Sequence, residues 1–154
     1  MRQRNSGWLS KWDAGAPPEF ETERIHSFGA MVRFFDYQAR SGAAAPLIIW
    51  YEGVLVGQIT LGGITYGALR SAHIGYWIDE RYAGRGIVPS SVRLVVGHAF
   101  GRLRLHRLEI NFRPENEASR RVAEKCGFIY EGERKSFLYI DHGWRDHLCY
   151  VLFE

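Results

Sequence analysis

A glycine turn between an apolar strand and a helix constrains this chain most. The segment 72–79 (AHIGYWID) has the composition of a β-strand, Gly84 and Gly86 follow it one residue apart, and a helical apolar pattern begins at Ile87. Glycines leave peptide N–H groups unshielded, and the first N–H groups of a helix have no partner within it. The helix dipole adds positive charge there. The turn is therefore predicted to bind an anion.

Two common phosphate-binding loops do not match this turn. A P-loop requires a lysine and then serine or threonine after its last glycine, and no lysine lies near Gly84 and Gly86. A dinucleotide-binding fingerprint requires a third glycine where Pro89 stands, and it lies in a βαβ unit. Here the preceding strands predict an antiparallel meander, so both alternatives fail on residues and on context.

The remaining pattern predicts one α/β domain over residues 1–154, a length that suits a single core. A helix is expected from Thr22 to Ala39, with Thr22 or a neighbour as its cap and an apolar face turned to the core. The members of that face are Ile25, Phe28, Val32, Phe35 and Ala39. Two β-rich runs on either side of Glu52-Gly53 predict a hairpin, which the strand 72–79 extends to a meander.

The second half of the chain alternates between helix and strand. Pro89 suits the first turn of a helix, whose apolar stripe is Val88, Val92, Val95, Ala99 and Leu103. A strand is expected at 105–112, followed by a helix with a cap at Asn116 and an end at Gly127. The last strands, 128–131 and 135–153, are expected to turn at 141–143.

Composition narrows the function. The net charge of +3 is mild and has no dense basic block, which favours a small polyanionic ligand over duplex DNA. No apolar run is long enough to span a membrane and no secretion signal is evident, so a cytoplasmic protein is expected. Cys126 and Cys149 lack the spacing of a metal or redox site and are expected to be reduced thiols. The histidines and aspartates of 141–147 are better explained as a hairpin turn than as metal ligands.

Arg81-x-x-Gly84-x-Gly86 resembles the acyl-CoA loop of the GCN5-related N-acetyltransferases. The flanking segments match the same family in order and spacing: 74–78 upstream, and Asn116-x-x-Ser119 and 125–128 downstream. The match is closest to the RimJ/RimL branch, the ribosomal-protein-alanine N-acetyltransferases. It includes His106-Arg107, the segment 139–147, and Asn5-x-x-Trp8-Leu9-x-x-Trp12.

This resemblance implies a mixed, mostly antiparallel sheet with helices on both faces, and acetyl-CoA as cosubstrate with no metal. The pyrophosphate is expected on the loop amides with help from two arginines, the pantetheine arm on the strand backbone, and a further contact at the helix cap. The cofactor-binding residues are then Trp77, Ile78, Arg81, Gly84, Arg85, Gly86, Ile87 and Asn116. Read without the resemblance, Trp77 is equally a buried aromatic and Asn116 a helix cap.

There are three catalytic candidates, of which the resemblance implies the first and the residues themselves suggest the other two. Ser119 matches the serine that some relatives use to hydrogen-bond the leaving sulfur, and a first-turn serine that caps helix N–H groups is the alternative. The base that deprotonates the acceptor is expected to be His73 or Glu109, or else the acceptor arrives neutral. A glutamate that serves some relatives aligns with Leu138, so its role cannot be transferred.

The expected acceptor is the N-terminal amino group of a protein such as a ribosomal protein, bound near Trp8, Trp12 and Tyr139. A small-molecule amine or antibiotic is the enzymatic alternative, and a non-catalytic acyl-CoA-binding module is the alternative from another class. No DNA or membrane partner is expected. Family members usually carry a first strand and most of a first helix before the Asn5 motif, so this domain is expected either to be truncated at its start or to lack an edge strand. A missing edge strand would expose unpaired backbone, and a monomer or homodimer is expected.

Overall fold

The computed structural model describes residues 1–23 and 27–154, and the side chains of 1–20 and 27–154. Within these residues the strands form one sheet in the order β1-β2-β3-β4-β6-β5. Their bounds are β1 Ala45–Tyr51, β2 Val54–Thr65, β3 Ser71–Ile78, β4 Arg107–Phe112, β5 Ile129–Ile140 and β6 Gly143–Phe153. The α-helices are α1 Ser6–Leu9, α2 Phe28–Arg40, α3 Ile87–Gly101 and α4 Glu117–Lys125. Short 3₁₀ turns lie at Gln3–Asn5, Pro18–Glu23 and Glu80–Tyr82.

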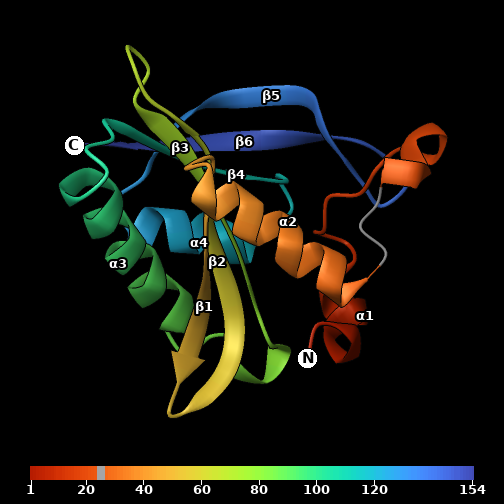
Figure 1. The fold of residues 1–154 in the computed structure, drawn as a ribbon. Coiled ribbons are helices and arrows are strands. Elements are labelled where there is room, and N and C mark those ends of the chain that lie inside the picture. The colour runs from red at the N-terminus through yellow and green to blue at the C-terminus, as the bar shows by residue number, and fades with distance from the viewer. Residues whose placement is uncertain (24–26) are drawn as a thin grey trace.

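The helices cover the two faces of the sheet. In Figure 1, α2 crosses in front of β2 while α4 lies behind it. The apolar stripe expected for α3 is buried at Val88, Val92, Val95 and Ala99 and packs with Ala123 of α4 against the sheet. The mixed α/β architecture with helices on both faces is therefore confirmed.

The expected meander is present, because β1, β2 and β3 pair antiparallel in sequence order. The turn at Glu52-Gly53 places both residues at positive φ, which suits a two-residue hairpin. A second such turn, with Asp141 and His142 at positive φ, joins β5 to β6. β1 forms one edge of the sheet.

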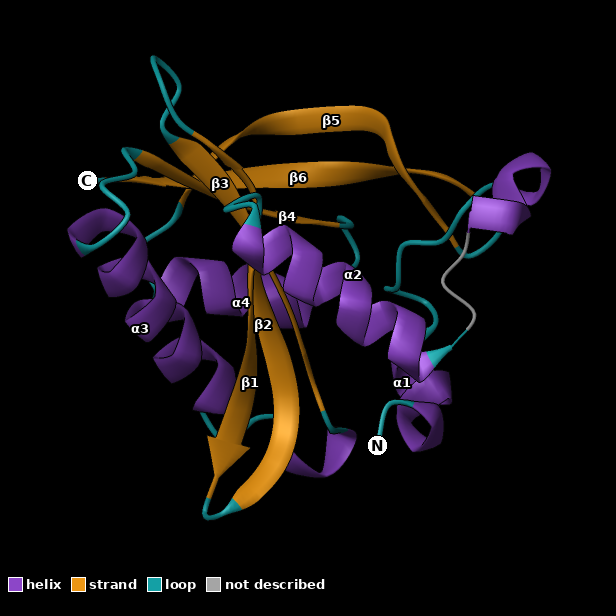
Figure 2. Cartoon of the chain, in the orientation of Figure 1, coloured by secondary structure: helices purple, strands orange, loops and turns teal. Residues whose placement is uncertain are grey.

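β3 and β4 are paired over a short length only. Their parallel ladder joins Ser71, Ala72 and His73 to Arg107, Leu108 and Glu109. Beyond these residues, β3 continues to Ile78 and β4 to Phe112, but the two strands no longer pair with one another. Figure 2 shows the two strands separating beyond this point. The sheet thus has an internal split, along which the facing peptide groups of β3 and β4 do not bond to one another.

The prediction for the first long helix was wrong in two respects. α2 begins at Phe28, because the Ser27 side chain accepts a hydrogen bond from the Ala30 N–H and caps the helix there, six residues beyond the start expected at Thr22. The expected member Ile25 lies outside the described residues. Phe28 is 77% exposed and Val32 47%, so these two side chains do not face a core.

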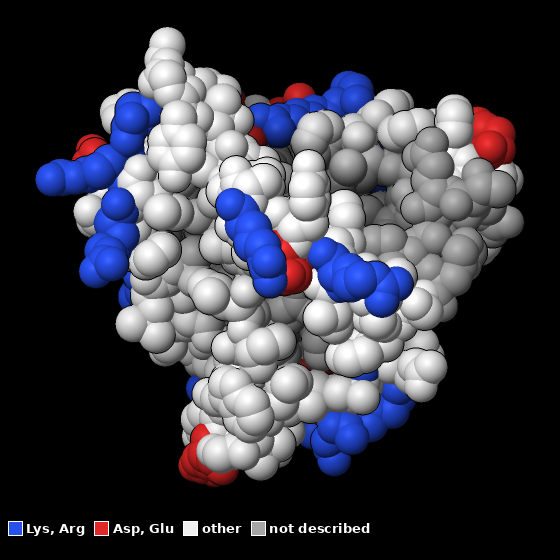
Figure 3. Space-filling model, viewed as in Figure 1, with Lys and Arg blue, Asp and Glu red and all other residues white. Residues whose placement is uncertain are grey.

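The least exposed face of α2 is instead formed by Ala30, Met31, Phe35 and Gln38, and only Phe35 belongs to the predicted stripe. α2 is apolar on more than one side, so periodicity alone did not select the packed side. In Figure 3 the face that carries α2 shows a few charged side chains separated by uncharged surface. No helix in the described ranges is both long and apolar enough to cross a membrane.

Candidate active site

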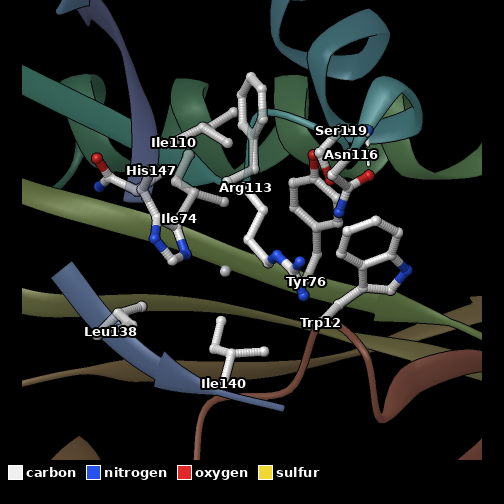
Figure 4. A pocket seen from close by; sticks show the side chains of 13 residues that line it. Trp12, Ile74, Tyr76, Ile110, Arg113, Asn116, Ser119, Leu138, Ile140 and His147 are labelled. Carbon is white, nitrogen blue, oxygen red and sulfur yellow. Dashed lines mark hydrogen bonds between the residues drawn. The ribbon is translucent and has the colours of Figure 1, made fainter. Parts of the chain in front are cut away.

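The split between β3 and β4 opens into a cavity of about 160 Å³. Its walls come from both strands, from α4, from the β5–β6 hairpin and from the N-terminal segment (Figure 4). The lining residues are Trp12, Ile74, Gly75, Tyr76, Ile110, Asn111, Phe112, Arg113, Asn116, Ser119, Leu138, Ile140 and His147. The cavity therefore joins the two faces of the sheet at the point where the sheet is not hydrogen-bonded.

The glycine turn lies beyond the end of β3 and leads into α3. Gly84 and Gly86 have φ values of +76° and +77°, a region in which glycine is free of the strain that other residues meet. Among the described residues, no protein group accepts a hydrogen bond from the peptide N–H groups of 84–88. No heavy atom lies within 4 Å of where a side chain at either glycine would begin. The turn presents a row of open donors at a helix N-terminus, which is a site for an anion.

Asp79 fixes the approach to this turn. Its carboxylate is 1% exposed and accepts hydrogen bonds from the Arg81 side chain at 3.0 and 3.1 Å, from the Arg81 N–H, and from Arg4 at 2.6 Å. The bond from the Arg81 guanidinium is the largest of the causes that hold the pKa of Asp79 far below its usual value. The Arg81 guanidinium is thus engaged within the protein and positions the turn. Arg85 is also exposed beside the glycines, and its guanidinium lies 5.1 Å from the Tyr82 ring centroid.

The backbone edge of β3 differs from expectation by one residue. The Asp79 N–H bonds to the Val56 carbonyl on β2, so by alternation the peptide groups of Tyr76 and Ile78 face β4 and the split. The Trp77 carbonyl instead points at Gly57 of β2, where an added side chain would lie 2.3 Å from it. The Trp77 backbone is therefore not on the free edge. The Ile78 carbonyl is on that edge and accepts a hydrogen bond of 3.2 Å from Trp8 Nε1.

Asn116 and Ser119 meet at the start of α4. The Asn116 side chain accepts a hydrogen bond of 3.0 Å from the Ser119 N–H, so Asn116 is the N-cap of α4. Both residues line the cavity, as expected of a cofactor contact and a thiolate donor. The cap thereby holds the first turn of α4, and with it the Ser119 hydroxyl, against the split.

Tyr76 was not assigned a role from the sequence. Its hydroxyl is buried beside Ser119, yet no described residue gives it a well-formed hydrogen bond. Burial is the main cause that raises the pKa of Tyr76. The alternation of Ile74, Tyr76 and Ile78 along β3 places Tyr76 on the α3–α4 face and was the signal that could have identified it. An orphaned buried hydroxyl in a cavity marks a position where a ligand group can bond.

His73 and Glu109 face one another at the last paired position of β3 and β4, and neither lines the cavity. The His73 ring lies over Gly62 and Gly63 of β2, where an added side chain at Gly62 would come within 2.6 Å of Nε2. The Glu109 carboxylate is bound by Arg107 at 2.8 Å and by Arg134 at 2.6 Å. Burial raises the pKa of Glu109, but the hydrogen bonds and the arginine charges together outweigh burial, so the pKa lies below its usual value.

Of the three aromatic residues expected at the acceptor site, Trp12 lines the cavity, and Trp8 and Tyr139 do not. Trp8 supports β3 from outside the cavity, and the Tyr139 ring packs edge-on against Trp144 on the β5–β6 hairpin. Leu138 and Ile140 flank Tyr139 and turn to the cavity in its place. His147 is also in the cavity wall and is 2% exposed, although the sequence alone gave it no role beyond the hairpin.

The fold is thus an α/β sheet that is split between two strands, with an open row of amides beyond the end of β3 and a cavity lined by two hydroxyls in the split, an arrangement that suits an anionic, elongated ligand. Residues 8–129 match the model of the family described as "Acetyltransferase (GNAT) domain". The chain belongs to this family.

Individual proteins agree with this assignment. The chain is 45% identical over 93 residues to "Probable N-acetyltransferase YjcK" of Bacillus subtilis (60% of this chain, 51% of YjcK). It is 27% identical over 101 residues to "[Ribosomal protein uS5]-alanine N-acetyltransferase" of Escherichia coli (66% of this chain, 52% of that protein). The chain thus spans about half the length of these relatives. A solved structure, "Mycobacterium smegmatis RimJ in complex with CoA-disulfide", superposes with a TM-score of 0.91 at 35% identity and covers 99% of this chain and 73% of that one.

Proposed function

We propose that this protein transfers an acetyl group from acetyl-CoA to a primary amine, and that the preferred acceptor is the N-terminal amino group of a protein such as a ribosomal protein. The observation that carries the proposal is the row of open N–H groups at 84–88, which follow the Ile78 end of β3, where β3 and β4 are no longer paired. Membership of the acetyltransferase family and the CoA in the M. smegmatis structure support it.

Coenzyme A fits the donors that this chain presents. Its pyrophosphate can accept hydrogen bonds from the amides of Gly84, Arg85, Gly86 and Ile87, each worth about 1.5–3 kcal/mol because the acceptor is charged. Arg85 adds a cation beside them. The pantetheine arm is then directed along the β3 edge, where the Tyr76 and Ile78 peptide groups face the split, and Asn116 lies across the split from it.

Bound acetyl-CoA supplies a thioester carbonyl that an amine can attack. Ser119, whose N–H donates to the Asn116 cap, is the residue we assign to hydrogen-bond the sulfur as it leaves, and Tyr76 lies beside it as a second hydroxyl. The proposals of His73 or Glu109 as base remain open to test, although the structure favours neither: the His73 ring packs on β2 glycines and the Glu109 carboxylate is bound by two arginines.

The acceptor side of the cavity supports a protein N-terminus. Trp12, Leu138 and Ile140 form an apolar wall there. A second hollow is lined by Trp144 and Asp146, and Arg113 lines both this hollow and the cavity. An extended chain can occupy both hollows, whereas a small amine needs the cavity alone. The E. coli relative that acetylates an alanine of a ribosomal protein supports the same acceptor class.

The test is acetyl-CoA turnover, measured by thiol release and by mass spectrometry of products. Peptides that begin with alanine or serine are compared with spermidine as a small amine and with the same peptides blocked at their N-terminus. Transfer to the free peptides alone is expected. Transfer to spermidine alone would favour a small-amine enzyme. Binding of acetyl-CoA in calorimetry without thiol release for any amine would favour a non-catalytic acyl-CoA-binding module.

A further inference from the structure

His147 is the one imidazole in the described lining of the cavity, and its tautomer follows from a single contact. Nδ1 lies 3.1 Å from the Arg145 carbonyl oxygen. A carbonyl oxygen only accepts hydrogen bonds, so Nδ1 carries the hydrogen and donates it. In the neutral ring, Nε2 is then left with a lone pair. Among the described residues, no protein group hydrogen-bonds to Nε2.

The surroundings of His147 favour the neutral ring. Burial is the largest cause that lowers its pKa, and the Arg113 cation lowers it further. The Arg145 carbonyl, Asp146 and Glu115 act in the opposite direction. On β5, the Phe137 ring packs edge-on against His147 at 5.5 Å, and the register partner Arg134 is bound to Glu109. At neutral pH the imidazole is therefore unprotonated, with the lone pair on Nε2.

The position of His147 complements that of Ser119. In Figure 4 the His147 ring projects into the cavity from one side, and Asn116 and Ser119 lie at the other side. Leu138 and Ile140, which line the acceptor part of the cavity, lie near the His147 side. A proton acceptor and a hydroxyl donor thus lie on opposite sides of the space in which an amine and a thioester would meet.

We propose that Nε2 of His147 is the general base of the transfer, an inference that rests on the proposed function. As the amine nitrogen forms its bond to the acetyl carbon, a proton passes from that nitrogen to Nε2, directly or through one water. The bond from carbon to sulfur breaks, and the sulfur leaves as a thiolate that Ser119 hydrogen-bonds and solvent protonates. The Arg145 carbonyl holds the ring in the required tautomer and orientation.

A general base contributes about 10²–10⁴-fold to rate, which sets the expected loss. His147→Asn is the sharpest variant, because its amide can still donate to the Arg145 carbonyl while the Nε2 lone pair is gone. We expect kcat with an alanine-peptide acceptor to fall at least about 100-fold. The acetyl-CoA dissociation constant should not change. In the wild type, kcat/KM should rise with pH through a pKa below the usual 6.5 of histidine, and this limb should be absent in the variant.

His142→Asn, at an exposed turn position on the same hairpin, is the matched control and should retain activity and the pH limb. If His147 had only a packing role, His147→Asn would retain most of the activity, and that result would overturn the proposal. His147→Gln provides a second variant of nearly the same volume in case the asparagine variant does not fold.

The failure of this inference can be told apart from the failure of the proposed function. If the wild type binds acetyl-CoA but transfers the acetyl group to no amine, both the proposed function and the role of His147 are contradicted. If the wild type transfers acetyl groups and His147→Asn is equally active, only the role of His147 is contradicted. Nitrogen NMR of the wild-type histidines gives an answer that needs no acceptor: hydrogen on Nδ1 is expected at pH 7, and hydrogen on Nε2 would overturn the proposal.

Discussion

Tyr76 shows how a single buried group can point to a ligand. A buried hydroxyl that loses its hydrogen bonds to water and gains no protein partner lowers the free energy of unfolding. The protein retains such a hydroxyl in the wall of the cavity beside Ser119. Such a group has a function only when something enters the cavity. The pantetheine arm or the thioester of acetyl-CoA is the ligand that the proposed function brings within its reach.

The Tyr76→Phe variant tests this argument. Removal of the unpaired hydroxyl should leave the free energy of unfolding unchanged or raise it by up to about 1 kcal/mol. The same change should lower kcat/KM about tenfold, a loss of about 1.4 kcal/mol of interaction with the reacting ligand. Urea unfolding and steady-state kinetics measure the two effects. Tyr130→Phe, at an exposed tyrosine on β5, is the control, and equal kinetics in both variants would contradict the role of Tyr76.

Asp79 predicts a pH dependence of stability. Arg81 and then Arg4 bind its carboxylate, so its folded-state pKa lies below the unfolded value of about 3.9. A depressed pKa contributes stability above the unfolded pKa, and this contribution is lost as pH falls toward the folded pKa. Asp79→Asn should therefore lower the free energy of unfolding by about 1.5 kcal/mol at pH 7. The difference from the wild type should shrink between pH 5 and pH 3. A difference that is constant with pH would show that the charge is not the cause.

At the scale of elements, the sequence predicts best where the deciding interactions are local. α3 and α4 begin where Pro89 and Asn116 indicate, because caps and first-turn residues act within a few positions. The meander follows from alternation and the Glu52-Gly53 turn. α2 is different: its sequence is apolar around much of its circumference, so the packed side depends on β1 and was assigned incorrectly.

The glycine turn gives a prediction at the same scale. Valine at Gly86 must adopt a φ near +77° and covers open amides with a branched side chain, so Gly86→Val should raise the acetyl-CoA dissociation constant at least tenfold in calorimetry. It should also cost about 1–2 kcal/mol of stability. Gly97→Ala is the control, since Gly97 is exposed within α3 and has open space around it.

Gly97→Ala should add about 0.5–1 kcal/mol of stability and leave binding unchanged, because alanine is the better helix former. An unchanged dissociation constant in Gly86→Val would place the pyrophosphate elsewhere.

The same distinction between local and long-range interactions applies to the candidate site. The glycine turn, Asn116 and Ser119 could be found from sequence because each lies in a short motif at the end of an element. Trp77 was assigned one residue away from the free edge, since only the β2–β3 register shows which peptide groups face the split. His147 on β6 and Ser119 on α4 line the same cavity, and no spacing rule could show that the hairpin turns the His147 ring into it.

At the scale of the whole molecule, the N-terminal segment is a brace for the glycine turn. The Asn5 side chain accepts a hydrogen bond from the Glu80 N–H, Arg4 binds Asp79, and Trp8 donates to the Ile78 carbonyl. These bonds span 70–75 residues of sequence, and Figure 1 shows the N-terminal end beside the turn that follows β3. The entry to the turn is thus held by residues that do not line the cavity.

Asn5→Ala tests whether this brace acts on the site. Asn5 is 4% exposed, so the variant leaves the Glu80 N–H without its partner and should lower the free energy of unfolding by about 1–3 kcal/mol. If the brace sets the turn, the acetyl-CoA dissociation constant should rise severalfold although Asn5 is not in the cavity wall. Ser10→Ala, at an exposed neighbour, should change neither quantity. A less stable variant with wild-type affinity would show that the amides of Gly84 and Gly86 keep their geometry without the N-terminal segment, and that α3 and Asp79 alone position them.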